Sequence, residues 1–247
     1  MIAHQAEAIV LRAWPIHEAD LIVSLFTREQ GRIRGVAKAA AKSRKRFGGA
    51  LEPMTHVRAS YAERPRQELV RLDSFEVLAS PLSDPVDYAR AAALAFFTEV
   101  LEETLPEQDP QDAIFRLLLA VLEHTRVEQV WLPLTYFSLW TTRLLGWLPD
   151  LTRCVVCGAG LPSAPAHFHP AVDGLVCAVD RRPGSSGLTP ESQALAGRVF
   201  RSPISALAAE PWPRNRAVDL RRFAVQALER HIERKLTSAA ALARLGG

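Results

Sequence analysis

The chain has 247 residues, 48% of them hydrophobic, and a formal net charge of +3 at neutral pH. No stretch approaches the ~20 consecutive apolar residues of a membrane helix, and the first residues lack the basic segment and apolar run of a secretory signal. We therefore expect a cytoplasmic protein with real hydrophobic cores. One domain for every ~150 residues is a loose prior, so the chain allows one to three domains.

The charges are unevenly distributed along the chain. Residues 1–80 carry 13 basic and 9 acidic groups, residues 81–153 carry 5 and 11, and residues 154–247 carry 12 and 7. A basic head, an acidic middle and a basic tail indicate separate modules with different partners. We expect one domain over residues 1–80 and another over residues 81–247.

The first domain is predicted to consist of β-strands. Short apolar runs that indicate strands lie at residues 8–11, 21–27, 32–38, 55–61 and 69–78. Turns at Gly31 and at Arg64-Pro65-Arg66 separate successive runs. Five short strands fit a partly open barrel of the OB type, which commonly binds single-stranded nucleic acid. A small SH3-like barrel would show nearly the same pattern, so alternation alone does not separate the two.

A concentration of cations is the most informative feature of this domain. Between positions 32 and 46 the chain has seven basic residues and no acidic one: Arg32, Arg34, Lys38, Lys42, Arg44, Lys45 and Arg46. Cations on a strand and its following loop suit a polyphosphate backbone, and these seven are the predicted DNA-binding residues. The alternative is a solvated loop whose charge only aids solubility. Phe47 is the one aromatic residue beside it, which favours backbone contact over extensive base stacking.

From residue 81 the pattern becomes helical. Asp84-Pro85 and Asp109-Pro110 each provide an N-cap followed by a proline that suits a first helical position. A third helix is predicted over residues 131–145, with Gly146 as its C-terminal cap. Aromatic residues gather here: Trp131, Tyr136, Phe137, Trp140 and Trp147. Base-stacking platforms would use such residues, but aromatics at helical spacing more often pack in a core, and we favour that interpretation.

Two further helices are predicted late in the chain. Thr189-Pro190 begins a short one, and a longer one covers residues 217–236. The polar face of the longer helix carries Arg221, Arg222, Arg230, Arg234 and Lys235. These charges are either solvated or extend the basic surface, and the pattern does not choose between them.

Three cysteines indicate a metal site. Cys154 and Cys157 form a Cys-x-x-Cys pair, and Cys177 follows after nineteen intervening residues. This spacing is that of a zinc ribbon or knuckle, in which two turns each present two ligands to a tetrahedral ion. The fourth position holds Asp180 rather than a cysteine, and His167 or His169 could supply the fourth ligand instead.

Two alternatives to zinc remain at this insert, which we place at residues 150–183. One is a thiol pair without a metal. The other is redox catalysis, which is disfavoured because no thioredoxin-like βαβ pattern surrounds the Cys-x-x-Cys pair. The predicted fold class is thus α+β: an N-terminal five-stranded OB-fold barrel followed by an α-helical domain with a zinc-ribbon-like cysteine insert.

Two functional classes other than a DNA-binding protein remain. An enzyme such as a nuclease or zinc hydrolase is disfavoured, because the acidic residues of the middle segment lie on helix faces or around a turn, and no phosphate loop or Gly-x-Ser-x-Gly motif is present. An RNA-binding OB-fold module is the alternative function, and only the barrel pattern and the charge favour it.

Six stretches in this order resemble the RecO family of bacterial recombination mediators and DNA repair proteins, over essentially the whole chain. They are AEAIVL at 6–11, EAD at 18–20, GRIRGVAK at 31–38, GALEP at 49–53, YFSLW at 136–140 and LLGWLPD at 144–150, which runs on to Cys154 and Cys157. No single motif is decisive, but their order and spacing are.

The resemblance implies a protein without a catalytic centre that acts on the nucleoid. It implies binding of single- and double-stranded DNA, annealing of complementary strands and contact with the acidic tail of single-strand-binding protein. With the partner RecR, such a protein helps to load the RecA recombinase onto coated strands. The family's zinc ligands carry over to Cys154, Cys157 and Cys177, while Asp180 departs from the expected cysteine.

Overall fold

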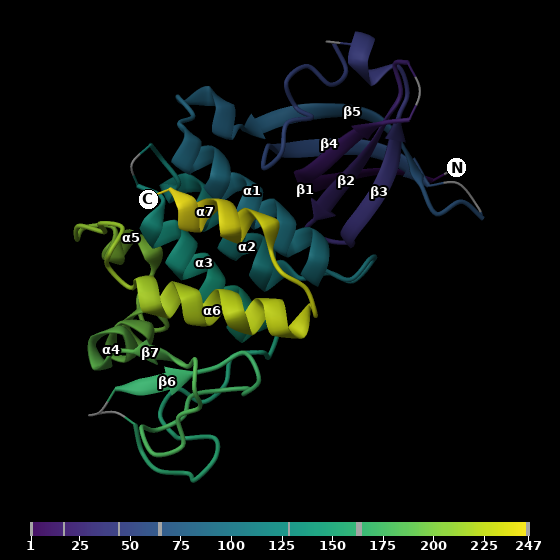
Figure 1. Ribbon diagram of the computed structural model, residues 1–247. Helices are drawn as coiled ribbons and strands as arrows, with labels where there is room; N and C mark the ends of the chain where they lie inside the picture. Colours follow the sequence, from purple (N-terminus) through teal and green to yellow (C-terminus); the bar gives the residue numbers. More distant parts are fainter. Residues whose placement is uncertain are drawn as a thin grey trace. The chain divides into compact units, whose positions relative to one another are not determined.

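The computed structural model describes residues 2–16, 18–43, 45–63, 66–127, 129–161 and 165–245 (Figure 1). The chain divides after Arg116 into two compact units. Among the helices described, none combines the length and the apolar character needed to cross a membrane.

The first unit is built around a closed five-stranded barrel with the strand order β1-β2-β3-β5-β4. Its strands are β1 (Ile2–Pro15), β2 (Leu21–Thr27), β3 (Gly31–Ala37), β4 (His56–Glu63) and β5 (Val70–Ala79). The long β1 pairs with β4 through its first half and with β2 through its second, and a bulge between Val10 and Arg12 lets it bend. β3 and β5 pair in parallel over three residues, which closes the barrel. The predicted OB-fold is confirmed.

The barrel is filled by alternate side chains of each strand. Ala8 and Val10 of β1 and Val23 and Leu25 of β2 are fully buried in one cluster. Because successive strand residues point to opposite faces, Phe26 lies on the outside of the barrel, where its ring meets Phe115 at 5.3 Å between centroids.

Helix α1 (Tyr88–Thr104) also belongs to this unit and contacts β1. It begins three residues later than a cap at Asp84 predicts, because Asp87 is the N-cap and its carboxylate accepts the Arg90 N–H at 2.7 Å. The carbonyls of Asp84 and Pro85 instead accept the Arg90 guanidinium at 3.2 and 2.7 Å. A short 3-10 helix, η2 (Pro81–Ser83), precedes this segment.

Helix α2 (Asp112–His124) likewise begins after the predicted Asp109-Pro110 signal. The residues before it run beside β3 instead, where the Gln108 N–H donates to the Arg32 carbonyl at 3.0 Å. Gln108 has a φ of 56°, so the chain is not helical just before Asp109, and the helix begins only where the Phe115 N–H donates to the Gln111 carbonyl at 2.9 Å. Both Asp-Pro pairs thus lie close to the start of a helix, but neither gives its first residue.

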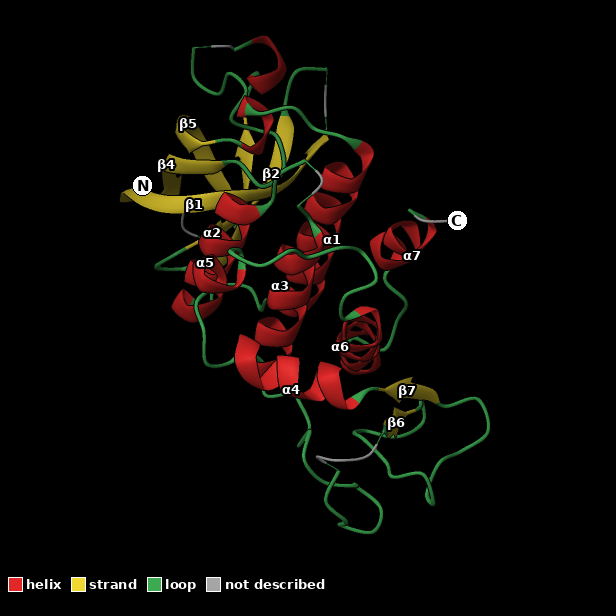
Figure 2. Cartoon of the chain, turned by 90° about the vertical axis from the view of Figure 1, so that its left-hand side faces the viewer, coloured by secondary structure: helices red, strands yellow, loops and turns green. Residues whose placement is uncertain are grey.

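The second unit is mainly helical (Figure 2). Its elements after α2 are α3 (Trp131–Leu144), β6 (Ala166–Phe168), β7 (Ser186–Leu188), α4 (Pro190–Val199), α5 (Ile204–Leu207), α6 (Val218–His231) and α7 (Thr237–Arg244). α3 packs on α6, and β6 pairs with β7 in a two-stranded sheet. The predicted cap at Thr189 is confirmed, since its hydroxyl accepts the Ser192 N–H at 3.2 Å. Gly146 follows α3 with a φ of 75°, as a C-terminal cap requires.

The helix predicted over 217–236 forms, but it ends earlier than predicted. α6 ends at His231, Glu233 takes a φ of 55°, and a separate α7 follows. The Glu229 carboxylate accepts the Leu236 N–H at 3.0 Å, which fixes the bend between the two helices. Arg221 is also not on a polar face: it is 9% exposed and donates to Thr135 Oγ1 at 3.1 Å.

The aromatic residues of the helical unit pack within it, as favoured from the sequence. Phe137 is fully buried, and the Trp140 indole donates to the Val199 carbonyl at 3.3 Å and meets the Phe200 ring edge-on. Trp147 stacks on His231, with 4.9 Å between ring centroids. These contacts occupy the ring faces and edges that base stacking would need.

Candidate nucleic-acid interface and metal centre

The predicted basic stretch follows β3 into the loop toward β4, through the short 3-10 helix η1 (Ala40–Lys42). The structure places its seven cations in three different settings. Arg44 lies outside the described residues. The other six separate into paired arginines, a loop-holding arginine and exposed lysines.

Arg32 and Arg34 on β3 are paired with carboxylates. Arg32 is 9% exposed and lies 3.5 Å from both Glu102 of α1 and Glu107. Arg34 contacts the same Glu107 at 3.2 Å. Glu102 is also the acceptor for the Ser24 hydroxyl of β2. These two arginines therefore hold β3 against the segment around α1, and their charge is largely matched.

Arg46 organises the loop. Its guanidinium donates to the Lys38 carbonyl and, through Nε, to Ser43 Oγ at 3.0 Å. The Arg46 carbonyl accepts the Phe75 N–H of β5 at 2.8 Å. The neighbouring Phe47 is 2% exposed and packs edge-on against the Phe75 ring at 5.3 Å. Phe47 thus anchors the loop in the barrel core and presents no ring for base stacking.

Lys38, Lys42 and Lys45 are exposed. Among the described residues, none of the three has an ion-pair partner, so their ammonium groups face solvent at one end of the barrel. Three uncompensated lysines on one strand end and loop form a cationic surface, which we call the lysine loop. Among the described members of the predicted set, these three are the most accessible to an anionic ligand.

A cleft beside the lysine loop was missed by sequence reasoning. It has a volume of about 480 Å³. Its lining residues are Val36, Lys38, Arg66, Gln67, Glu68, Leu69, Val70 and Arg71. Arg71 pairs with Asp73 at 2.8 Å, and Arg66 is exposed. In OB-folds the β4–β5 loop is part of the ligand face, and that general rule is the signal that could have added Arg66 and Arg71.

The cysteine insert forms two tight turns that face each other. In the first turn, the Gly158 N–H donates to the Cys154 carbonyl at 2.9 Å. Gly158 has a φ of 74°, a backbone conformation that is unfavourable for residues with a side chain. The Val155 N–H donates to the Leu175 carbonyl at 2.9 Å, so the first turn is joined to the strand-like segment that leads to Cys177. A Cys-x-x-Cys-Gly turn is the local structure that a zinc knuckle needs.

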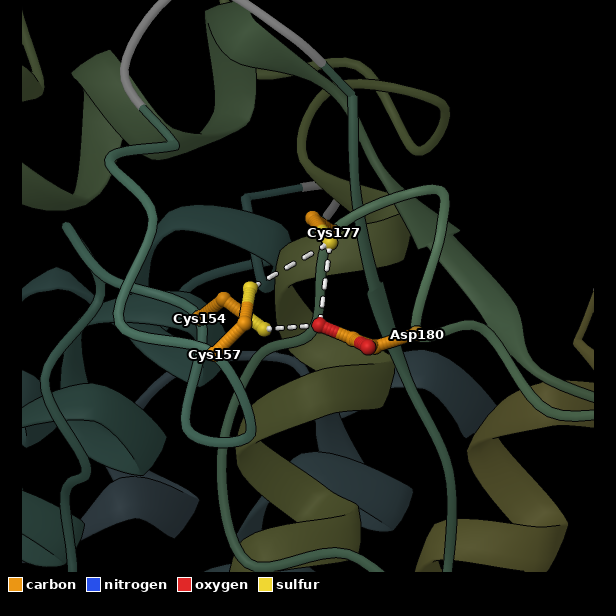
Figure 3. A group of neighbouring side chains, drawn as sticks. All are labelled: Cys154, Cys157, Cys177 and Asp180. Atoms are coloured by element: carbon orange, nitrogen blue, oxygen red, sulfur yellow. Dashed lines mark hydrogen bonds between the residues drawn. The ribbon is translucent and has the colours of Figure 1, made fainter.

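Four side chains from these turns converge (Figure 3). One ligand atom from each of Cys154, Cys157, Cys177 and Asp180 lies within 4.8 Å of all the others. The Cys157 and Cys177 sulfurs are 3.8 Å apart, which equals the edge of about 3.8 Å for a tetrahedron with Zn–S bonds of about 2.3 Å. Asp180 Oδ2 lies 3.1 Å from Cys154 Sγ and 3.2 Å from Cys177 Sγ, so the carboxylate needs to move outward by only roughly 0.4 Å.

The electrostatics of the cluster also favour a cation. The Asp180 carboxylate is the main cause that raises the pKa of Cys157 to about 12. Burial alone would raise the pKa of Cys154, but backbone N–H groups of Cys157, Cys177 and Val156 outweigh it and lower the pKa. Hydrogen bonds from the thiols, that of Cys157 first, lower the pKa of Asp180. A divalent ion would relieve the repulsion that ionised thiols meet beside this carboxylate.

The two histidines considered as a fourth ligand are not in the cluster. His167 pairs through its backbone with Val176, and burial, followed by the charge of Arg181, lowers the pKa of its ring. His169 Nδ1 accepts the Ala171 N–H at 3.1 Å. The described structure therefore brings Asp180, and neither histidine, to the three sulfurs.

This combination defines an OB-barrel protein with a cationic loop, followed by a helical unit that carries a knuckle-type cluster able to hold a metal ion. Comparisons with known proteins identify the class more closely. A family model described as recombination protein O N-terminal matches residues 1–81, and one described as recombination protein O C-terminal matches residues 85–240.

Individual relatives agree with the family models. The chain is 60% identical over 241 residues to the DNA repair protein RecO of Koribacter versatilis, which covers 98% of each chain. It is 31% identical to the RecO of an Anaeromyxobacter species over 96% of this chain and 95% of the relative. The RecO of Bifidobacterium adolescentis is 34% identical over 86% and 84%. The chain therefore belongs to the RecO family of DNA repair proteins.

Proposed function

We propose that this protein is a non-catalytic DNA-binding mediator of recombinational repair. It binds single- and double-stranded DNA, anneals complementary strands and, together with RecR, helps to load RecA onto strands coated by single-strand-binding protein. It does so on the nucleoid in the cytoplasm and recognises single-strand-binding protein through the acidic tail of that partner. Membership of the RecO family and the exposed lysine loop support this proposal.

Within the barrel we assign phosphate contact to Lys38, Lys42 and Lys45, and keep Arg44 in the same set. Each cation that neutralises a phosphate releases condensed counterions, and this contribution is independent of base sequence. Annealing needs the repulsion between two polyanions reduced while base edges stay free, and lysines on a loop suit that task. Arg32, Arg34 and Arg46 support this surface by holding β3 and the loop in place.

We also propose that Cys154, Cys157, Cys177 and Asp180 hold one zinc ion. All four positions are protein ligands, so the ion would be structural and would join the two turns of the insert. Support comes from the four converging ligand atoms and from the sulfur–sulfur separation of 3.8 Å. Elemental analysis of the purified chain should find zinc, and a C157S variant should lose it.

Annealing of two complementary oligonucleotides, each coated with single-strand-binding protein, tests the main proposal. The wild type should accelerate annealing, and K38E/K42E/K45E should not. Arg46 is left unchanged because R46E would disturb the loop as well as remove a charge. R126E/R201E/R244E changes the net charge equally at exposed residues outside the barrel and should behave like the wild type.

Each other outcome has a clear meaning. If the folded wild type fails to accelerate annealing but binds RNA oligonucleotides tightly, the RNA-binding alternative replaces the DNA proposal. If the lysine variant and the control lose activity equally, overall charge rather than the lysine loop is responsible.

A further inference from the structure

The three cysteines of the cluster differ sharply in their surroundings. Cys154 is 2% exposed, and its sulfur accepts backbone N–H groups of Cys157, Cys177 and Val156. Cys157 is exposed, and Cys177 is partly exposed. The cluster therefore has one sulfur held inside the insert and two that solvent can reach.

The two accessible sulfurs face each other from opposite turns (Figure 3). Their separation is 3.8 Å, and a disulfide requires about 2.05 Å, so the two sulfurs must approach each other by roughly 1.8 Å to join. The fourth member, Asp180, contributes oxygen and cannot take part in a disulfide. In a four-cysteine site each turn has a second sulfur that could take part in the disulfide instead. Here the second turn has only one sulfur, that of Cys177.

We propose that Cys157 is a peroxide-reactive modification site and that Cys177 resolves it by forming a Cys157–Cys177 disulfide. The release of metal that follows rests on the zinc site proposed above. The oxidant is a hydroperoxide, with hydrogen peroxide as the simplest case.

The chemistry balances in two steps. The Cys157 thiolate is the form that a zinc ligand takes and a minor form of the metal-free thiol beside Asp180. This thiolate attacks one peroxide oxygen, the O–O bond breaks, and sulfenic acid and hydroxide form. The Cys177 thiolate then attacks the Cys157 sulfur, the S–S bond forms, the S–O bond breaks, and a second hydroxide leaves. Two thiolates are oxidised by two electrons, and one peroxide is reduced to two hydroxides.

The disulfide removes two of the four ligands, so Cys154 and Asp180 alone remain to hold an ion. The base of the insert has its own attachment to the rest of the unit. Arg230 of α6 donates to the carbonyls of His169 and Pro170 at 3.2 and 2.6 Å, and Phe168 meets Phe223 of α6 at 5.4 Å between centroids. Oxidation should therefore release metal and loosen the two turns while the insert stays attached to α6.

The test uses the full chain, freed of reductant under nitrogen and analysed for zinc. Hydrogen peroxide is then added while zinc release is followed with a chromogenic chelator and free thiols with a thiol reagent. A non-reduced digest, analysed by mass spectrometry, identifies the joined cysteines. We expect two thiols to be lost for each zinc released, a Cys157–Cys177 linkage, and Cys154 recovered as a free thiol.

C177S provides the matched control, because it keeps the exposed Cys157 and removes the resolving thiol. Peroxide should leave Cys157 in this variant as a sulfenic acid that dimedone traps, with no linkage to Cys154. A dominant Cys154–Cys157 linkage in the wild type, or zinc retained at full thiol content, overturns the proposal.

The two proposals fail separately. A chain isolated without zinc, and unable to bind added zinc, refutes the metal site and with it the release. Mapping of the disulfide in that metal-free chain still decides whether Cys157 pairs with Cys177.

Discussion

The basic residues between Arg32 and Arg46 have three different kinds of environment. Arg32 is enclosed by Glu102 and Glu107, Arg46 holds backbone and side-chain acceptors of its own loop, and the lysines face solvent. The carboxylates that neutralise Arg32 lie far along the chain. A run of cations therefore predicts a cationic surface, but which cations are available depends on contacts that the run itself does not contain.

Gly31 provides a test at the same scale. It has a φ of 69°, and a Cβ built on it would lie 2.1 Å from the carbonyl oxygen of Asp109. G31A should lower the free energy of unfolding by more than about 2 kcal/mol, since the backbone conformation and the contact are both unfavourable for alanine.

G49A is the matched control, because a Cβ there meets no atom within 4 Å. It should change the free energy of unfolding by less than about 0.5 kcal/mol. Urea denaturation followed by circular dichroism measures both. Equal midpoints for the two variants would show that the close approach at Gly31 is not part of the folded protein.

Elements were predicted best where the sequence carries both a periodic pattern and a terminator. The five strands and α3 have such signals, and Thr189 and Gly146 cap their helices as expected. The starts of α1 and α2 were placed too early, because Asp-Pro is also compatible with the extended segments that precede these helices. The helix predicted over 217–236 ends early, at His231, and α7 beyond it has no counterpart in the sequence prediction. The Glu229 contact with the Leu236 N–H stabilises the bend between α6 and α7.

Arg230 provides a test at the scale of elements, because it joins α6 to the cysteine insert. R230A should speed amide hydrogen exchange at residues 169–173, since three carbonyls of that segment lose their donor. R230K should recover only part of the protection, because an ammonium lacks the planar fork of a guanidinium.

R222A on the same helix is the control, since Arg222 is exposed. Its exchange pattern should match the wild type. Protection at 169–173 that is unchanged in R230A would mean that other contacts hold the insert to α6.

The whole molecule carries its charge in blocks, and the proposed DNA binding should therefore depend on salt. Affinity for single-stranded DNA should fall with salt with a logarithmic slope of about −0.7 for each phosphate neutralised. K38Q/K42Q/K45Q should therefore reduce the magnitude of the slope by about 2, and should weaken binding to oligonucleotides of different sequence alike.

Fluorescence anisotropy at several salt concentrations measures this slope. R126Q/R201Q/R244Q is the control and should leave the slope unchanged. An affinity that falls in the lysine variant for only some oligonucleotides would indicate contact with bases rather than with phosphates.

The sequence by itself determined the α+β class, a small five-stranded barrel, the helical second half, the family resemblance and the three cysteines. These are determined locally, because alternation, caps and ligand spacing are written in neighbouring residues. Only the tertiary structure decided that Asp180 rather than His167 or His169 joins the sulfurs, that Arg221 is buried, and that Arg32 and Arg34 are paired. Each of these depends on groups that are distant in the chain and meet only when it folds, so no local pattern records them.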